Sequence, residues 1–233
     1  MHFSPLAAST QEAQAIDSLW RSTANRGASS STLVLTGSAA TEAAMKQRAP
    51  EFRVIHLATH GYFLNDRCDS SFELARSAPE SSMAAGPAGE SPLLLSGLAL
   101  AGANRRVDAG AQDEDGILTA EEIASLDLSG VDWAVLSACE TGVGRIQLGE
   151  GVLGLRRAFE VAGAGTLIMS LWKVEDQSAR EWMQYLYEGR LEGLTSAEAA
   201  RKAGLTMLKK RRAKSRSTSP FSWGAFVAAG DWR

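Results

Sequence analysis

The sequence predicts a single α/β domain, built as a three-layer sandwich in which a mostly parallel sheet carries helices on both faces. The chain has 233 residues, of which 45% are apolar, and this is enough for one sizeable core. Short apolar runs alternate along the chain with amphipathic helical patterns. The runs are almost continuously apolar, which is typical of strands buried on both faces of a parallel sheet.

Each element follows from the spacing of its apolar residues. Strands are expected at 32–37, 52–61, 132–139, 165–172 and 223–232, with 93–102 as a further segment able to pair. Helices are expected at 9–20, 41–49, 119–128, 149–165, 176–193 and 195–212. Region 65–115 is rich in Gly, Pro, Ser and acidic residues, so we expect a long irregular insertion within one domain that spans 1–233.

Helix starts carry capping signals. Two of them show a hydroxyl followed three residues later by a glutamate, the capping-box pattern: Ser9 with Glu12, and Thr119 with Glu122. Single capping residues are expected at Thr41, Asp176 and Thr195.

Composition argues against several classes of protein. A formal net charge of −3 with 22% charged residues is an ordinary balance, so we expect neither a nucleic-acid partner nor a membrane. No apolar run approaches the roughly 20 residues that cross a bilayer. The first residues lack a secretory signal, so reduced thiols in a cytoplasmic compartment are expected. The spacing of Cys68, Cys139, His56 and His60 matches no metal-site pattern, and we expect neither a metal nor a cofactor. His56, within a strand, is expected to be a packed, hydrogen-bonded core residue.

Three predicted strands end in reactive side chains. His60 ends one strand, Cys139 ends the next, and Glu175 and Asp176 follow a third. Because ligands bind beyond the carboxyl ends of parallel strands, these groups are expected to share one rim. An imidazole can take the proton of a thiol, and the backbone N–H groups of Gly61 and Cys139 could stabilise an oxyanion. Spacing alone also allows a plain buried cysteine and a structural histidine.

Several stretches together resemble the CHAT domain: "VIHLATHGYF", "LLLSGLALAGAN", "DGILTAEEIASLDLSG", "VLSACETGVGRIQLGEGVLGLRRAFEVAGAGTLIMSLWKVED" and "FSWGAFVAAGD". This caspase-like module, related to caspases, separase and gingipains, is often attached to tetratricopeptide repeats. The resemblance implies a caspase-haemoglobinase-like fold and a cysteine endopeptidase with a His60–Cys139 dyad. It implies a thioester acyl-enzyme and an oxyanion hole formed by the N–H groups of Gly61 and Cys139. It also implies a protein or peptide substrate in a regulatory or defence pathway, and a regulatory repeat domain or partner chain.

One feature departs from that family. Its members usually have a hydrophobic strand before the first helix, whereas this sequence begins almost at the helix. A short protein, a fragment of a larger chain and an excised domain are the alternatives. We therefore expect a sheet edge that lacks a partner strand.

Substrate selection has several candidate residues. A carboxylate of Asp176 or Glu175 in the S1 pocket would favour a basic P1 residue, whereas Trp172 would shape an apolar pocket. Asp176 is expected mainly to cap its helix. Two alternatives to the endopeptidase stay open: a catalytically silent module that docks peptides or partners, and another thiol hydrolase or transferase. The basic run 209–217 is expected to be a solvated helix end and loop.

Overall fold

The computed structural model describes residues 2–6, 8–24, 31–63, 93–110, 114–137, 150–172 and 174–231. Its main sheet has the strand order β1 (Val54–Leu57), β5 (Trp133–Leu136), β6 (Thr166–Ser170) and β7 (Phe226–Gly230). The first three strands run parallel, and β7 pairs antiparallel with β6. The predicted mostly parallel sheet is therefore confirmed.

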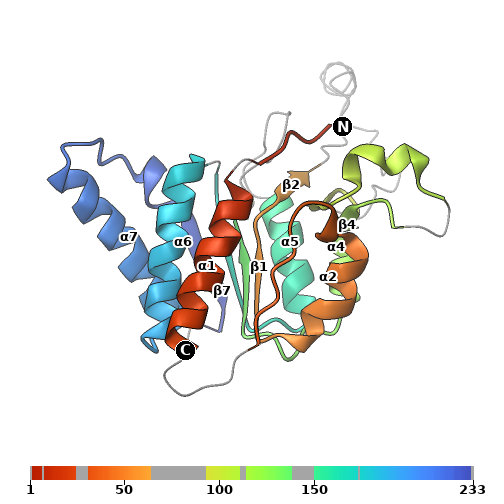
Figure 1. Cartoon of the computed structure of the whole chain (residues 1–233), viewed down its shortest axis with the longest axis horizontal. Coiled ribbons are helices and arrows are strands. Elements are labelled where there is room, and N and C mark those ends of the chain that lie inside the picture. Colours follow the sequence, from red (N-terminus) through yellow and green to blue (C-terminus); the bar gives the residue numbers. More distant parts are fainter. Residues whose placement is uncertain are drawn as a thin grey trace, which may run out of the picture.

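Helices cover both faces of this sheet, as Figure 1 shows. One face carries α1 (Ser9–Ala24), α6 (Asp176–Leu191) and α7 (Ser196–Ala213), and the other carries α2 (Glu42–Arg48), α4 (Ala120–Ala124) and α5 (Glu150–Val161). Alternate side chains of β5 enter two separate cores. Trp133 and Val135 pack in the core under α6 and α7, whereas Ala134 and Leu136 pack in the core under α4 and α5. This alternation explains why the strand is apolar at every position.

A second, antiparallel sheet of three strands follows β1. It contains β2 (His60–Phe63), β3 (Ser96–Ala99) and β4 (Ile117–Thr119) in the order β2-β3-β4. The predicted strand at 52–61 is thus wrong in its extent, because it breaks into β1 and β2, and Gly61 lies inside β2. Residue 97 must be glycine here, since a Cβ would lie 2.5 Å from the carbonyl oxygen of Leu118.

The region predicted as an irregular insertion, 65–115, is partly regular. Residues 93–102 supply β3, as expected of a segment able to pair, and the 3-10 helix η3 (Ala103–Asp108) follows. Residues 64–92 and 111–113 lie outside the described part of the chain. The other 3-10 helices are η1 (Gly37–Ala39), η2 (Ala49–Glu51) and η4 (Pro220–Ser222). Within the described ranges, no helix combines the length and the apolar character that a bilayer crossing requires.

Three of the predicted helix caps are confirmed. The hydroxyl of each accepts a hydrogen bond from the backbone N–H three residues later, at Thr41, Thr119 and Thr195. The capping box at Ser9 is wrong: Ser9 is the first helical residue, and its hydroxyl donates to the carbonyl oxygen of Leu6. The cap at Asp176 is also wrong, because Glu175 occupies the N-cap position and its carboxylate accepts from the Ser178 hydroxyl.

The predicted strand at 32–37 is not formed. Residues 31–36 take part in no ladder within the described chain, and the side chains of Leu33, Val34 and Leu35 are 36–40% exposed. Among the described residues, β1 is the outer strand of the main sheet and pairs with β5 alone.

Candidate active site

The carboxyl ends of β1, β5 and β6 lie at one edge of the main sheet, because these strands run parallel. Leu57 is the register partner of Leu136, and the backbone N–H of Ser137 donates to the carbonyl oxygen of Leu57 at 3.0 Å. His60 lies three residues beyond Leu57. Cys139 comes three residues after Leu136 in the sequence but falls outside the described residues.

His60 is held by the backbone of the N-terminal segment. Its side chain is almost fully buried, with 7% exposure for the residue, and Nε2 lies 2.6 Å from the carbonyl oxygen of Ser4. A carbonyl oxygen only accepts hydrogen bonds, so Nε2 must carry a proton and donate it. In the neutral ring, the lone pair that can accept a proton is then on Nδ1.

The side chains of Asn104 and Tyr62 contact this segment at Phe3. Asn104 forms two hydrogen bonds with the backbone of Phe3. Its Oδ1 accepts from the Phe3 N–H and its Nδ2 donates to the Phe3 carbonyl, both at 2.8 Å. The Phe3 ring lies 5.7 Å from the His60 ring and 6.2 Å from the Tyr62 ring, measured between centroids. Burial raises the pKa of Tyr62 to about 12, so its hydroxyl stays protonated at neutral pH.

The turn that leads into His60 is fixed as well, because the Thr59 hydroxyl donates to the carbonyl oxygen of Ala99 on β3. His60 stays a candidate from the sequence, whereas its neighbours Phe3, Ser4 and Asn104 were not among the sequence candidates. Ser4 contributes a backbone carbonyl, which has no side-chain signal. Asn104 follows the β3 strand, and a polar residue after a strand was the signal available there.

The candidates for substrate selection follow β6 at the same edge of the sheet. Glu175 and Asp176 are exposed at the start of α6. Trp172 is half-buried, donates from Nε1 to the carbonyl oxygen of Phe221 at 3.0 Å and stacks on the Phe221 ring. Gly61 is buried in β2 opposite Leu98. The roles of these four residues in an S1 pocket or oxyanion hole stay predictions.

His56 belongs to a different network, on the α1 face of the sheet. Its Nε2 lies 2.9 Å from Oε1 of Glu12 on α1, and its Nδ1 lies 3.1 Å from the hydroxyl of Tyr187 on α6. The Glu12 residue is buried. The prediction that His56 is a packed, hydrogen-bonded core residue is therefore confirmed.

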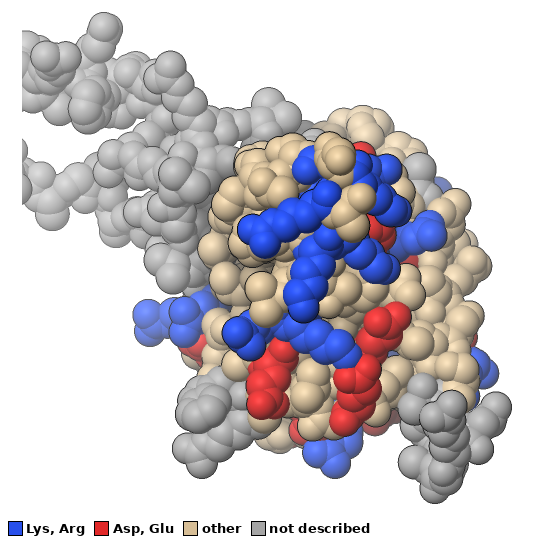
Figure 2. All heavy atoms as spheres, turned by 90° about the vertical axis from the view of Figure 1, so that its left-hand side faces the viewer, with Lys and Arg blue, Asp and Glu red and all other residues tan. Residues whose placement is uncertain are grey.

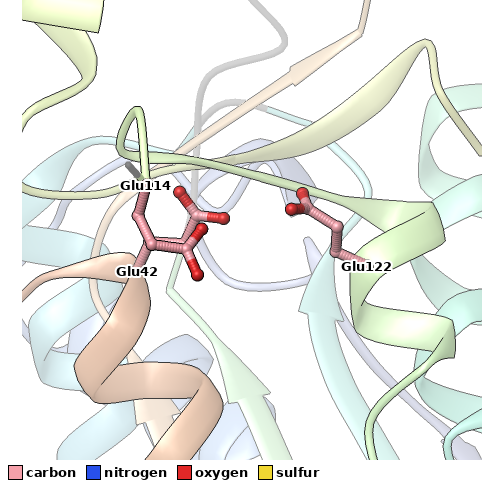
Figure 3. Close-up of side chains that lie close together, drawn as sticks. All are labelled: Glu42, Glu114 and Glu122. Carbon is pink, nitrogen blue, oxygen red and sulfur yellow. The ribbon is translucent and has the colours of Figure 1, made fainter. Parts of the chain in front are cut away.

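Three carboxylates meet beside α2, as Figure 3 shows: those of Glu42, Glu114 and Glu122. The ammonium of Lys46 lies 2.7–2.8 Å from an oxygen of each, so the cation among them is an amino acid side chain. Burial raises the pKa of Glu42 to about 7, against the lowering effect of Lys46. Burial alone would lower the pKa of Lys46, but its hydrogen bonds to the three carboxylates outweigh this and raise it. The cluster ties α2 to the start of α4.

The basic run 209–217 spans the last turn of α7 and the loop after it, and Figure 2 shows lysine and arginine side chains gathered on this end of the molecule. Its residues are mostly exposed, and the Arg211 guanidinium donates to the carbonyl oxygen of Ser217. Cations are favoured at a helix C-terminus by the helix dipole. The expectation of a solvated helix end and loop is confirmed.

Comparison with known proteins gives the same family that the sequence motifs suggested. Residues 1–231 match the family model described as "CHAT domain". Among curated proteins, the chain is similar to Tetratricopeptide repeat protein 28 of Mus musculus, with 29% identity over 114 residues, and to its counterpart of Homo sapiens, with 28% identity over 114 residues. Each match covers 49% of this chain and 4% of the relative, so the chain spans a small part of those proteins. The match to the family model extends over nearly the whole sequence, and the chain belongs to the CHAT domain family.

Proposed function

We propose that this chain is a cysteine endopeptidase of the caspase-like type, with His60 and Cys139 as its catalytic dyad. The observation that carries the proposal is the state of His60. His60 opens β2, three residues beyond the carboxyl end of β1, and its Nε2 donates to the Ser4 carbonyl. This leaves Nδ1 as the basic nitrogen. Membership of the CHAT family supports the same reaction class.

The proposed reaction begins when Nδ1 of His60 takes the proton of the Cys139 thiol. The thiolate attacks the scissile carbonyl carbon, and the N–H groups of Gly61 and Cys139 stabilise the resulting oxyanion. The imidazolium then gives its proton to the leaving amine, so that a thioester remains. Water, deprotonated by the same ring, hydrolyses the thioester and regenerates the thiol.

The Ser4 carbonyl has a specific part in this cycle. It accepts from Nε2 in both the neutral and the protonated ring, so the ring keeps one orientation throughout. The hydrogen bond is strengthened when the ring becomes an imidazolium, because the donor is then charged. Ser4 therefore stabilises the charged intermediate through its backbone.

Substrate and context follow as further parts of the proposal. Glu175 or Asp176 would select a basic P1 residue, and Trp172 would instead favour an apolar one. A tetratricopeptide repeat region, as in the name of the two relatives, would act as the regulatory partner of the domain.

A docking module without catalysis is the second candidate. The observation that favours it is the burial of His60 under Phe3 and Ser4, which a peptide substrate would have to approach from another side or displace. Such a module would bind a peptide at the same sheet edge and leave it uncut.

A peptide-library cleavage assay separates the two candidates. The wild type is expected to cleave a subset of peptides, whereas Cys139→Ala and His60→Ala are each expected to be inactive while they unfold at the wild-type temperature. Cys68→Ala is the matched control and should keep full activity. Cleavage that survives both dyad substitutions would exclude the endopeptidase, and binding without cleavage by the wild type would favour the docking module.

A further inference from the structure

The end of α7 and the loop after it carry a dense group of cations, which we call the α7 basic surface. It consists of Lys209, Lys210, Arg211, Arg212, Lys214 and Arg216, and all of these except Arg211 are exposed. The helix dipole favours cations in the last turn of α7. It gives no reason for the cations at 214 and 216, because these residues lie beyond the helix. Helix capping therefore accounts for only part of the surface.

The carboxylates of the described residues leave the α7 basic surface unpaired. Other exposed cations of the chain form ion pairs, such as Arg48 with Glu51 and Arg156 with Glu160. In the described ranges, no member of the α7 basic surface has such a partner. The positive charge of this surface is thus available to an anionic partner.

Hydrogen bonds fix the loop that carries the last two cations. The Arg216 N–H donates to the carbonyl oxygen of Arg211 at 2.9 Å, and Nε of Arg211 donates to the Ser217 carbonyl at 2.6 Å. Nε1 of Trp223 donates to the Thr218 carbonyl at 2.9 Å. Groups that are held in place before binding lose less conformational freedom when a partner arrives. The loop therefore presents its cations as part of a defined surface.

The α7 basic surface lies at the carboxyl edge of the main sheet. The first residue of β7, Phe226, is the register partner of Ser170, the last residue of β6, so the chain between α7 and β7 crosses this edge. Within that connection, the exposed ring of Phe221 stacks on Trp172, two residues after β6. The start of α6 and the end of α7 also line one small cavity, of about 40 Å³. The basic surface and the proposed catalytic dyad thus belong to the same edge of the sheet.

One polypeptide is long enough to contact both places. Strand β6 is two strands away from β1, which is about 10 Å at a spacing of ~4.8 Å per strand. An extended chain rises about 3.3 Å per residue, so roughly three residues cross this gap. A segment that begins about four or more residues from the scissile bond would therefore reach α7.

Acidic side chains border the surface and limit what can bind there. The pKa of Lys210 is raised first by its hydrogen bond to the Tyr185 hydroxyl and further by the charges of Glu181 and Glu188, so these carboxylates of α6 lie near it. Figure 2 shows acidic side chains next to the gathered lysines and arginines. A nucleic acid or a membrane would extend past the cations and bring its negative charge against these carboxylates. A short acidic segment covers the cations alone.

We propose that the α7 basic surface binds a short segment, rich in Asp and Glu, of the polypeptide substrate. Complementary charge would speed the encounter and hold the substrate at the sheet edge that carries His60. The role in substrate selection rests on the proposed function, whereas the binding of an acidic segment does not.

The probe is the fluorescein-labelled peptide GSEEDEEDSG, with the neutral peptide GSQQNQQNSG as its control. Fluorescence anisotropy of each peptide is recorded while the full chain is titrated. We expect saturable binding of the acidic peptide and none of the neutral one. Binding should weaken about tenfold from about 50 to about 200 mM salt, because screening acts strongly on exposed charges.

Two charge-reversal variants are matched. Lys214→Glu/Arg216→Glu should weaken binding roughly tenfold or more, since two exposed cations of the surface become anions. Arg105→Glu/Arg106→Glu makes the same change of net charge at exposed positions of η3 and should leave binding within about twofold. Lys214→Gln/Arg216→Gln should lie between the wild type and the first variant. The urea midpoint of each variant checks that it is folded.

A second measurement tests the role in substrate selection. The acidic segment is joined, through a Gly-Ser linker of about five residues, to a peptide that the wild type cleaves. We expect KM to fall at least about fivefold relative to the same peptide with the neutral segment, with kcat unchanged. Lys214→Glu/Arg216→Glu should lose this difference.

Three results would overturn the proposal. These are the lack of saturable binding of the acidic peptide, equal binding by the wild type and Lys214→Glu/Arg216→Glu, and tighter binding of oligo(dT) or of phosphatidylserine vesicles than of the acidic peptide. The last result would assign the surface to a nucleic acid or to a membrane. Binding by a chain that cleaves no peptide would support the docking surface and contradict only the proposed catalysis. Cleavage without binding of the acidic probe would contradict only the docking surface.

Discussion

His56 and His60 are four residues apart and both are largely buried, but they are held in different ways. Both ring nitrogens of His56 contact side chains from two helices, Glu12 of α1 and Tyr187 of α6. His60 has its Nε2 fixed by a backbone carbonyl, from a segment that a side chain of η3 holds in place. The first arrangement fastens helices to a sheet, and the second sets the tautomer of a ring at a strand end.

Both histidines are largely buried and hydrogen-bonded, so these two features alone do not distinguish the proposed general base from a structural histidine. A carboxylate and a hydroxyl on the two nitrogens hold the His56 ring inside the core. The backbone carbonyl of Ser4 on Nε2 orients the His60 ring and leaves Nδ1 as the nitrogen that exchanges the proton in the proposed reaction.

Replacing each histidine by alanine is expected to give the largest difference between the two sites. His60→Ala should lower peptidase activity at least ~100-fold, since it removes the proposed general base. His56→Ala should keep activity per folded molecule and instead lower stability. Initial-rate assays and urea unfolding of the same preparations measure both effects. Equal loss of activity in both variants, at equal folded fraction, would contradict the distinction.

Glu12→Ala tests the structural role of His56 by removing its hydrogen-bond partner on α1. We expect the free energy of unfolding to fall by roughly 1–3 kcal/mol, because a largely buried nitrogen of His56 loses its hydrogen-bond partner. Glu12→Gln should cost less, since the amide keeps the size and the polar contact. Glu51→Ala, at an exposed position, is the control. If both Glu12 variants unfold like the wild type in urea, the network does not fasten α1.

Asn104→Ala tests the positioning of His60. The variant loses both hydrogen bonds to Phe3, so we expect a roughly tenfold lower kcat with little change in KM and an altered pH profile of kcat. Arg105→Ala, next in the chain, should behave as the wild type. An unchanged kcat and pH profile for Asn104→Ala would show that the hydrogen bonds between Asn104 and Phe3 do not orient the imidazole of His60.

Tyr187→Phe should have the smallest effect. Burial raises the pKa of the Tyr187 hydroxyl, so it stays protonated and contributes one hydrogen bond to His56. Loss of this bond is expected to cost ~1 kcal/mol of unfolding free energy. A cost above that of Glu12→Ala would mean that the hydroxyl and not the carboxylate anchors the ring.

Much of the fold could be predicted from apolar spacing. The parallel strands β1, β5 and β6, the helices α6 and α7 and the caps at Thr119 and Thr195 all follow local patterns that the tertiary structure keeps. The capping box at Ser9 failed because Glu12 bonds to His56, far along the chain, and not to the start of its own helix. The strand at 32–37 failed because a ladder requires a neighbour as well as apolar residues.

The expected position of His60 at the end of a parallel strand is wrong, because β1 ends at Leu57 and His60 is the first residue of the antiparallel strand β2. The rule for parallel strands places Leu57 and Leu136 at one edge of the sheet, and His60 lies three residues beyond it. The Ser4 carbonyl could not be predicted, because any residue presents the same backbone group. The cap assigned to Asp176 was displaced by one residue to Glu175, an ordinary uncertainty of helix boundaries.

The most direct test of the His60–Cys139 pair is the rate at which each cysteine reacts with iodoacetamide at pH 7, followed by peptide mass spectrometry. We predict that Cys139 is alkylated at least ~10 times faster than Cys68, and that His60→Ala removes this advantage while His56→Ala keeps it. Equal alkylation rates for Cys139 in the wild type and in His60→Ala would contradict the pairing of this imidazole with the thiol.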